Sequence, residues 1–374
     1  MKIDDVSYNL IRLALYTDKV LPGSVSELWI DEGVEKEIRD SLDRVDAGDL
    51  ISKLKQQTRD LEAGDRQDYL LEMVSSLEYQ LQQKEGSLAE YYESCFGFRL
   101  ERISEDELGE LETTIVDLEK KTGKGRFEIF EERKVEPDKL IEKYILLLDS
   151  TKKSVPEYLT SIEDSEFKHE LVQNEPWSAF NTHYAPFKSK LSINSDIPLT
   201  SFDLFQLSLH EAWGGHHSEL SLKDKLLINE GRGEHGIVIV NSPQVYISEG
   251  IAEGMFEILG FRGNLDDEEM LLWFLTRYMF ALQNLVAHMY FDDKMNKDEI
   301  EAEIEKYDIG KKGREAVINF STDKMFGRYS AVYYSAYSLI TDLHEKAGDK
   351  ESFIKHLFTQ PCTPKLLRVN FLNN

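Results

Sequence analysis

Apolar residues at helical spacing constrain the fold of this chain most strongly. Between Val25 and Lys84 they recur every three or four residues, for example at Tyr69, Met73 and Leu77, which is the period of an α-helix with one buried face. The 374 residues include only 22 glycines and 9 prolines, a low share that suits long helices with few tight turns. The sequence therefore predicts a mainly α fold and excludes an all-β sandwich or barrel.

The helical pattern divides into two halves near residues 151–156. Residues 1–150, with expected helices at about 104–121 and 135–149, form an N-terminal helical half, and residues 151–374 form a second half that carries the metal site. We expect the two halves to make one compact unit with a central cleft. The most apolar window, Met270 to Phe291, is interrupted by Arg277 and other polar residues and predicts a buried helix rather than a membrane span.

A short β element is expected inside the second half. Residues 188–194 alternate polar and apolar side chains, as a strand at the edge of a sheet would, and the apolar run 237–240 predicts another short strand. Thr200 and Asp203 are typical of a helix start, so a helix is expected from Phe202 to about Trp213, and another from about Ser248.

The charge of the chain limits its partners. It has 44 basic and 70 acidic side chains, a net charge of −26, which repels both a phosphate backbone and an anionic membrane face. Neither nucleic acid nor a membrane is therefore an expected partner. The two cysteines, Cys95 and Cys362, make no disulfide framework or thiolate metal site, and residues 1–5 do not resemble a signal peptide. We expect a cytoplasmic protein, and the oligomeric state stays open.

The most informative segment contains three of the nine histidines within eight residues, in the order His210-Glu211-Ala212-Trp213-Gly214-Gly215-His216-His217. It begins like the zinc motif H-E-x-x-H, in which two histidines one helical turn apart bind the metal and the glutamate acts as general base. The position four residues after His210 is a glycine, however, so the simple motif fails.

Two adjacent glycines offer a way around this failure. In an unbroken helix His216 would lie about 240° around and about 9 Å along from His210, too far for one zinc ion. Gly214 and Gly215 allow a bulge or break that brings the two imidazoles together. His217 is expected to form a hydrogen bond instead, although the choice between His216 and His217 as ligand stays open.

The third ligand is expected from a later helix. Glu249 lies 33 residues after His216, and a two-histidine, one-carboxylate set leaves a fourth position for water. Glu253, one turn further along, is placed to accept a hydrogen bond from the outer ring nitrogen of a histidine ligand. Glu257, another turn along, could substitute for Glu253 in this role.

These motifs resemble a known family. The order His210-Glu211-Ala212-Trp213-Gly214-Gly215-His216-His217, followed by Glu249-Gly250-Ile251-Ala252, is similar to the H-E-A-aromatic-P-G-H-H and E-G-W-A motifs of the helical proteins called the domain of unknown function 885 family. That family is related in pattern to the gluzincin metallopeptidases. The resemblance implies a large multi-helix, gluzincin-like architecture with a small antiparallel β edge near the metal site.

The same resemblance implies two further site residues near the C-terminus. Arg328 and Tyr337 correspond to an arginine and a tyrosine of the family, and they are candidates for holding a substrate carboxylate or a developing oxyanion. The neighbouring tyrosines at 329, 333 and 334 form an aromatic stripe, which is more often core than catalytic.

The sequence thus predicts a zinc-dependent hydrolase, in which His210, His216 and Glu249 hold Zn²⁺ and Glu211 is the general base. A peptidase acting on a peptide or a small amide is the leading interpretation. Two alternatives stay open: a non-catalytic or structural metal-binding helical protein, and a hydrolase of a non-peptide amide or ester. A catalytic zinc keeps its fourth position open, whereas a structural zinc fills it with a side chain.

Overall fold

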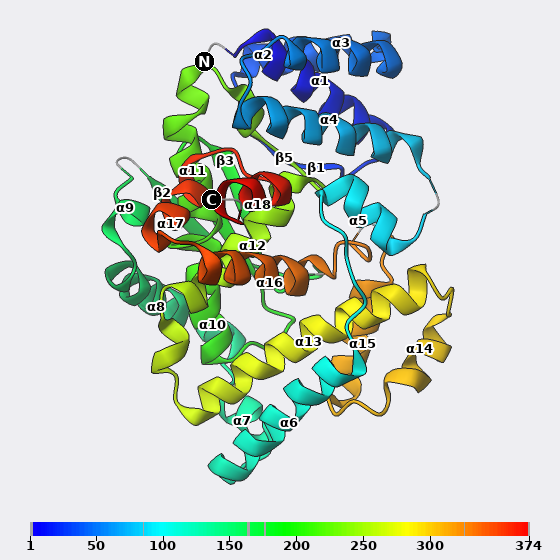
Figure 1. Ribbon diagram of the computed structural model, residues 1–374. Helices are drawn as coiled ribbons and strands as arrows, with labels where there is room; N and C mark the ends of the chain where they lie inside the picture. Colours follow the sequence, from blue (N-terminus) through cyan, green and yellow to red (C-terminus); the bar gives the residue numbers. More distant parts are fainter. Residues whose placement is uncertain (1–2, 85, 163–164, 176, 325, 373–374) are drawn as a thin grey trace.

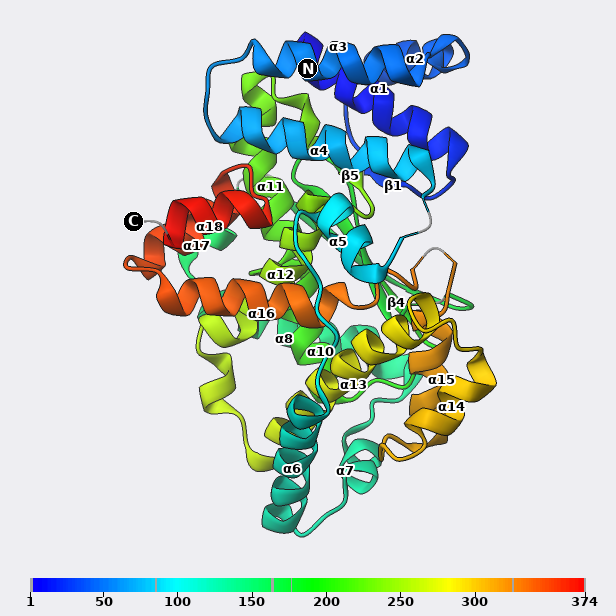
Figure 2. The same cartoon turned by 45° about the vertical axis from the view of Figure 1, so that its right-hand side comes forward.

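The fold was analysed in a computed structural model, which describes residues 3–84, 86–162, 165–175, 177–324 and 326–372. Helices dominate it, and the short strands lie between the helical layers (Figures 1 and 2). The prediction of a mainly α protein is confirmed.

The first four helices form a layer of their own at one end of the molecule, seen at the top of both views. Helix α1 packs against α3 and α4, and the apolar side chains of this layer form a small core together with Ile237 and Ile239 of a later strand. The helices of this layer are α1 (Asp5–Val20), α2 (Glu32–Ser41), α3 (Ala47–Arg59) and α4 (Asp65–Gln82).

The next five helices belong to the main core. Their buried residues join one cluster with those of the second half, and α6 packs along α13. The buried residues therefore form a smaller cluster in the first four helices and a larger one that begins with α5. The predicted boundary near residues 151–156 stays a prediction. These helices are α5 (Leu88–Phe96), α6 (Glu105–Thr122), α7 (Arg126–Arg133), α8 (Leu140–Ser154) and α9 (Glu157–Thr160).

A three-stranded mixed sheet follows, built from β2 (Glu166–Val172), β3 (Ala179–Ala185) and β4 (Lys188–Asn194). The order is β2-β4-β3, with β4 parallel to β2 and antiparallel to β3. The prediction that residues 188–194 form an edge strand is wrong, because β4 is the central strand. The alternation of polar and apolar side chains depends on what lies on the two faces of a strand. It carries no information about the neighbouring strands, which lie in the plane of the sheet.

A second, two-stranded ribbon links the N-terminal layer to the second half. Strand β1 (Val25–Leu28) pairs antiparallel with β5 (Ile237–Ile239), and the register shifts between Val25 and Glu27. Such a bulge re-aims the side chain that it carries.

The remaining helices complete the main core around one long helix. That helix, α13, is long and apolar enough to cross a membrane by length and composition alone, but 61% of its most apolar window is buried inside the protein. The helices are α10 (Ser201–Leu207), α11 (His216–Leu226), α12 (Pro243–Ile258), α13 (Asp267–Phe291), α14 (Lys297–Ile304), α15 (Gly310–Ser321), α16 (Val332–Lys346), α17 (Lys350–Thr359) and α18 (Pro364–Leu372).

Helices α12 and α16 approach each other closely because two glycines of α12 face α16. A Cβ atom on Gly250 would lie 2.7 Å from Ile340 Cγ1 and 2.9 Å from the carbonyl oxygen of Ala336, and one on Gly254 would lie 3.1 Å from Ile340. Larger residues at these positions would push the helices apart. The position of α12, which carries Glu249 and Glu253, therefore depends on this contact.

Candidate metal centre

The segment that begins with His210 and Glu211 lies in a helix that changes its pitch. Thr200 and Asp203 cap the start of α10 reciprocally, as a capping box, and α10 then widens into a π-helical turn over Ser208–Ala212. π turns are rare and often mark functional sites. This turn carries both His210 and Glu211.

The two glycines then reverse the path of the chain. Gly214 has a φ of +115°, which glycine adopts without cost, and Gly215 precedes the first residue of α11, His216. A Cβ on Gly215 would lie 1.7 Å from the carbonyl oxygen of His210, so only glycine allows this approach. The imidazoles of His210 and His216 come to lie 4.9 Å apart, centre to centre, and almost perpendicular.

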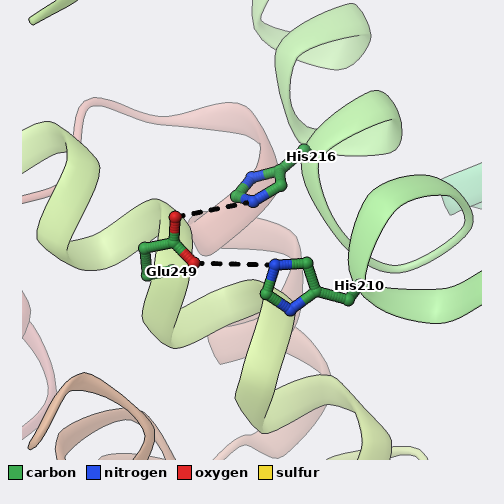
Figure 3. A group of neighbouring side chains, drawn as sticks. All are labelled: His210, His216 and Glu249. Atoms are coloured by element: carbon green, nitrogen blue, oxygen red, sulfur yellow. Dashed lines mark ion pairs between the residues drawn. The ribbon is translucent and has the colours of Figure 1, made fainter. Parts of the chain in front are cut away.

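Glu249 of α12 completes the group (Figure 3). Its Oε2 lies 3.6 Å from His210 Nε2, and its Oε1 lies 3.8 Å from His216 Nε2. One potential ligand atom from each of these three side chains falls within 4.8 Å of the others. The three side chains that the sequence singled out as ligands are therefore brought together.

The donor set fits a zinc ion. Bonds of about 2.1 Å at tetrahedral angles place neighbouring ligand atoms about 3.4 Å apart, close to the two distances between Glu249 and the histidines. Glu249 Oε2 is buried and has no hydrogen-bond partner, which is costly for a carboxylate oxygen. A cation between these side chains would satisfy it, and two imidazoles with one carboxylate are a typical zinc donor set.

The outer nitrogen of His210 is held by an acid. Its Nδ1 lies 3.1 Å from Glu253 Oε1, one turn beyond Glu249 on α12, where the sequence suggested such a partner. The other oxygen of Glu253 accepts a hydrogen bond from the buried Arg277 guanidinium of α13. This arrangement orients the ring so that Nε2 faces Glu249.

The outer nitrogen of His216 is held by a different chain of contacts. Ser248 donates its hydroxyl hydrogen to Glu219 Oε2 at 2.6 Å, and its oxygen lies 3.1 Å from His216 Nδ1. Because that hydroxyl is already donating to Glu219, His216 Nδ1 must be the protonated nitrogen, which leaves Nε2 free to ligate. Lys223 compensates the buried charge of Glu219 at 2.5 Å.

Replacing Ser248 by alanine is expected to weaken zinc binding about 10- to 100-fold, because His216 loses the group that fixes its tautomer. Zinc affinity can be measured by competition with a chelator of known affinity. Ser221→Ala is the matched control, because the Ser221 hydroxyl is also buried, on the same helix as His216, but has no hydrogen-bond partner among the described residues. Equal zinc affinities for the Ser248→Ala variant and the unaltered protein would contradict this role.

Glu211 lies beside the candidate ligands. Its Oε1 is 4.0 Å from His210 Nε2, and its Oε2 is buried without a hydrogen-bond partner. Burial raises the pKa of Glu211 to about 7, against the lowering effect of the His210 charge. A carboxyl group whose pKa lies near neutrality is suited to accept and return a proton.

The charges around the three ligands favour a bound cation. Burial alone lowers the pKa of His210, but the hydrogen bond that its Nδ1–H donates to Glu253, together with the carboxylates of Glu211 and Glu249, outweighs burial and raises that pKa to about 9. Burial and the His210 charge lower the pKa of His216 to about 3. The carboxylates therefore attract positive charge to this point, and His216 is in the neutral form that binds metals.

The group opens into a cavity of about 640 Å³. Its lining includes the three candidate ligands and Glu211, with residues of β1, β3, α12, α13 and α15 around them. A cavity of this size, largely apolar but with a few converging polar groups, is typical of a small-molecule or peptide site.

Three residues predicted for the site lie elsewhere. His217 contacts Ser189 of β4 through Nδ1 and packs on Phe167, so its neighbour His216 is the one that faces Glu249. The Arg328 guanidinium lies over the rings of Tyr91 and Phe291. Neither His217 nor Arg328 lines the cavity.

Tyr337, the third of these residues, donates its hydroxyl to Glu257 and stacks on Arg277. Glu257 also pairs with Arg262, so it does not replace Glu253 beside His210. The tyrosine that does reach the ligands is Tyr329, whose hydroxyl donates to Glu249 Oε1 at 2.5 Å. The aromatic stripe was visible in the sequence, but which of its members faces the ligands depends on the turn before α16.

Comparison with known proteins finds the fold but no family. No family model and no curated protein matches the chain. A solved structure described as "the putative lipoprotein from Colwellia psychrerythraea" is similar, with a TM-score of 0.57 and 15% identity, covering 96% of this chain and 65% of that one. A "putative lipoprotein of unknown function from Shewanella oneidensis" has a TM-score of 0.45 and 16% identity, covering 95% and 69%. At 15% identity, the Colwellia structure shows a shared fold alone.

Proposed function

We propose that this protein is a zinc-dependent hydrolase, and that its substrates are peptides. The observation that carries the proposal is the convergence of His210, His216 and Glu249, from two separate segments, beside the buried Glu211 at the cavity. Within the described residues, the group offers three side chains as ligands. This favours a catalytic site over a structural one, because a structural zinc takes four.

Zn²⁺ in such a site would be held by His210 Nε2, His216 Nε2 and Glu249. When bound, zinc lowers the pKa of a water molecule towards neutrality and polarises a substrate carbonyl. Glu211 would accept a proton from the attacking water and return it to the leaving amine. The net reaction breaks the C–N bond of an amide, with the water oxygen bonding to the carbonyl carbon and hydrogen to the nitrogen.

The sheet supports a peptide over a small amide. The sequence predicted an edge strand at residues 188–194, but β3, and not β4, is an edge strand of the sheet. Residues 178–181, at the start of β3, line the cavity, and Asn181 Nδ2 donates to the carbonyl oxygen of Glu211 at 2.7 Å. An extended peptide could add to this edge beside Glu211.

The resemblance to the domain of unknown function 885 family is part of the same proposal and is supported by the grouping of the motif residues. The cytoplasmic location stays a prediction. The similar Colwellia protein is described as a putative lipoprotein. Cell fractionation should therefore test whether this protein is cytoplasmic, or exported and lipid-anchored.

Zinc content tests the proposal directly. After dialysis against zinc, the protein is expected to retain about one ion per chain, whereas His210→Ala and His216→Ala are expected to retain almost none. His217→Ala is the matched control, because His217 is adjacent to His216 but bonds to Ser189. Circular dichroism would establish that all variants are folded. Equal zinc in His210→Ala and the unaltered protein would remove the central claim.

A further inference from the structure

The free edge of β3 has an identifiable end. Ser178 accepts a hydrogen bond from Asn194 N and so faces β4. Because backbone groups alternate sides along a strand, the N–H and C=O groups of Ala179 and Asn181 face away from β4. No strand pairs with this side of β3 in the described part of the chain.

Glu27 closes this edge two residues beyond Asn181. The next outward N–H along β3, that of His183, donates to Glu27 Oε2 at 2.7 Å. A peptide strand that pairs with Ala179 and Asn181 would therefore meet the Glu27 carboxylate roughly 7 Å past the position opposite Asn181. The bulge of β1 between Val25 and Glu27 turns the glutamate to this position.

Within the part of the chain that the structure describes, one oxygen of the Glu27 carboxyl group has no hydrogen bond and the group has no counter-charge. The Glu27 side chain is about nine-tenths buried, and it lines the same cavity as Glu211. Among the described residues the bond from His183 is its only one, and no cation pairs with it. Burial raises the pKa of Glu27 to about 8, and the Glu211 charge raises it as well. Burying a carboxylate without a counter-charge is costly, and the raised pKa means that the group is largely protonated at neutral pH. A positively charged group at Oε1 would favour its ionised form.

Charge decides which end of a peptide fits. Among the described residues, Arg277 is the one arginine or lysine that lines the cavity, and it is already paired with Glu253. Beside Glu27, a terminal carboxylate would therefore face an acidic group, and no lysine or arginine is free to receive it among the described residues that line the cavity. A terminal ammonium would face Glu27.

We propose that Glu27 binds the free amino terminus of the substrate, so that the enzyme removes one or two residues from the amino end of peptides. This inference rests on the proposed function for its chemistry, but it assigns a binding residue that the metal site does not require. The limit of one or two residues follows from the short length of edge between Asn181 and Glu27.

A binding measurement tests this inference without requiring the protein to cleave a peptide. The probe is a pentapeptide of alternating alanine and phenylalanine with an amidated C-terminus, either with a free amino terminus or with an acetylated one. Titration calorimetry is done on zinc-loaded Glu211→Gln protein, in which cleavage does not deplete the probe. We expect the free peptide to bind at least about tenfold more tightly, since a buried ion-paired hydrogen bond is lost on acetylation.

Adding Glu27→Gln to this protein should remove the preference. Glutamine can still accept the His183 hydrogen bond but carries no charge, so the two peptides are expected to bind within about twofold of each other. Glu32→Gln, at an exposed acid five residues further along the chain, is the control and should keep the preference. Equal binding of both peptides before the Glu27 change, or no binding of either, would overturn the inference.

The outcomes also distinguish the two proposals. If the free peptide is preferred through Glu27 but the unaltered, zinc-loaded protein cleaves nothing, the proposed hydrolase function fails while the binding assignment stands. If the unaltered protein cleaves acetylated and free peptides equally, and mass spectrometry finds internal cuts, the hydrolase stands and the role of Glu27 is wrong.

Discussion

Replacing Glu211 by glutamine is expected to lower kcat by about 10²- to 10⁴-fold while the protein keeps its zinc. The magnitude is that of a lost general base. Glutamine has the size of glutamate but cannot accept the proton, and none of the three candidate ligands is altered. The measurement is kcat on the best peptide substrate, together with the zinc content of the same sample.

A second acid provides the control for this prediction. Glu257 lies on α12, but it pairs with Arg262 and Tyr337 rather than facing the ligands. Glu257→Gln should keep both zinc and turnover. If the Glu211→Gln protein holds zinc and still turns over at the rate of the unaltered protein, another group is the base.

Replacing Gly215 by alanine is expected to destabilise the protein by about 3 kcal/mol or more and to abolish zinc binding. The added Cβ would lie 1.7 Å from the His210 carbonyl oxygen and 2.7 Å from that of Leu209. Both are backbone atoms of the π turn, so the clash cannot be relieved by a side-chain rotation, and overpacking against rigid atoms is among the most damaging substitutions. The melting temperature and zinc content measure the two effects.

Replacing Gly214 by alanine distinguishes the effect of a steric clash from that of a strained backbone conformation. The Gly214 φ of +115° is unfavourable for alanine, but an added Cβ would find its nearest neighbour 3.7 Å away. Gly214→Ala is therefore expected to cost only about 1–3 kcal/mol and to lower the melting temperature less than Gly215→Ala. The reverse order would show that the close approach at Gly215 does not hold the two histidines together.

Local chemistry made much of the fold predictable. The caps at Thr200 and at Ser242, which accepts from Val245 N at the start of α12, are short-range signals. The start of α12 was nevertheless predicted about five residues too late, at Ser248. The apolar window of α13 was recognisable as a core helix because polar residues interrupt it. These features depend on neighbours a few residues apart, which a sequence displays directly.

The candidate ligands were also predictable, for a related reason. His210, Glu211 and His216 lie within one short segment, and Glu249 and Glu253 are separated by a single helical turn. Each set has the spacing that its chemistry needs, except for the five residues between the two histidines, where the zinc motif has three. The two glycines indicated that the chain breaks there, but the π turn that precedes them could not be read from spacing.

What the sequence by itself determined is the helical class and the set of groups able to bind a metal, because both follow from local periodicity and side-chain chemistry. Only the tertiary structure decided that β4 is central, that Tyr329 reaches Glu249, and that Glu27 meets the end of β3. These contacts join segments 80 residues or more apart, or depend on neighbours in the plane of a sheet. Local patterns carry no record of such pairings, because the packing of the whole chain selects them.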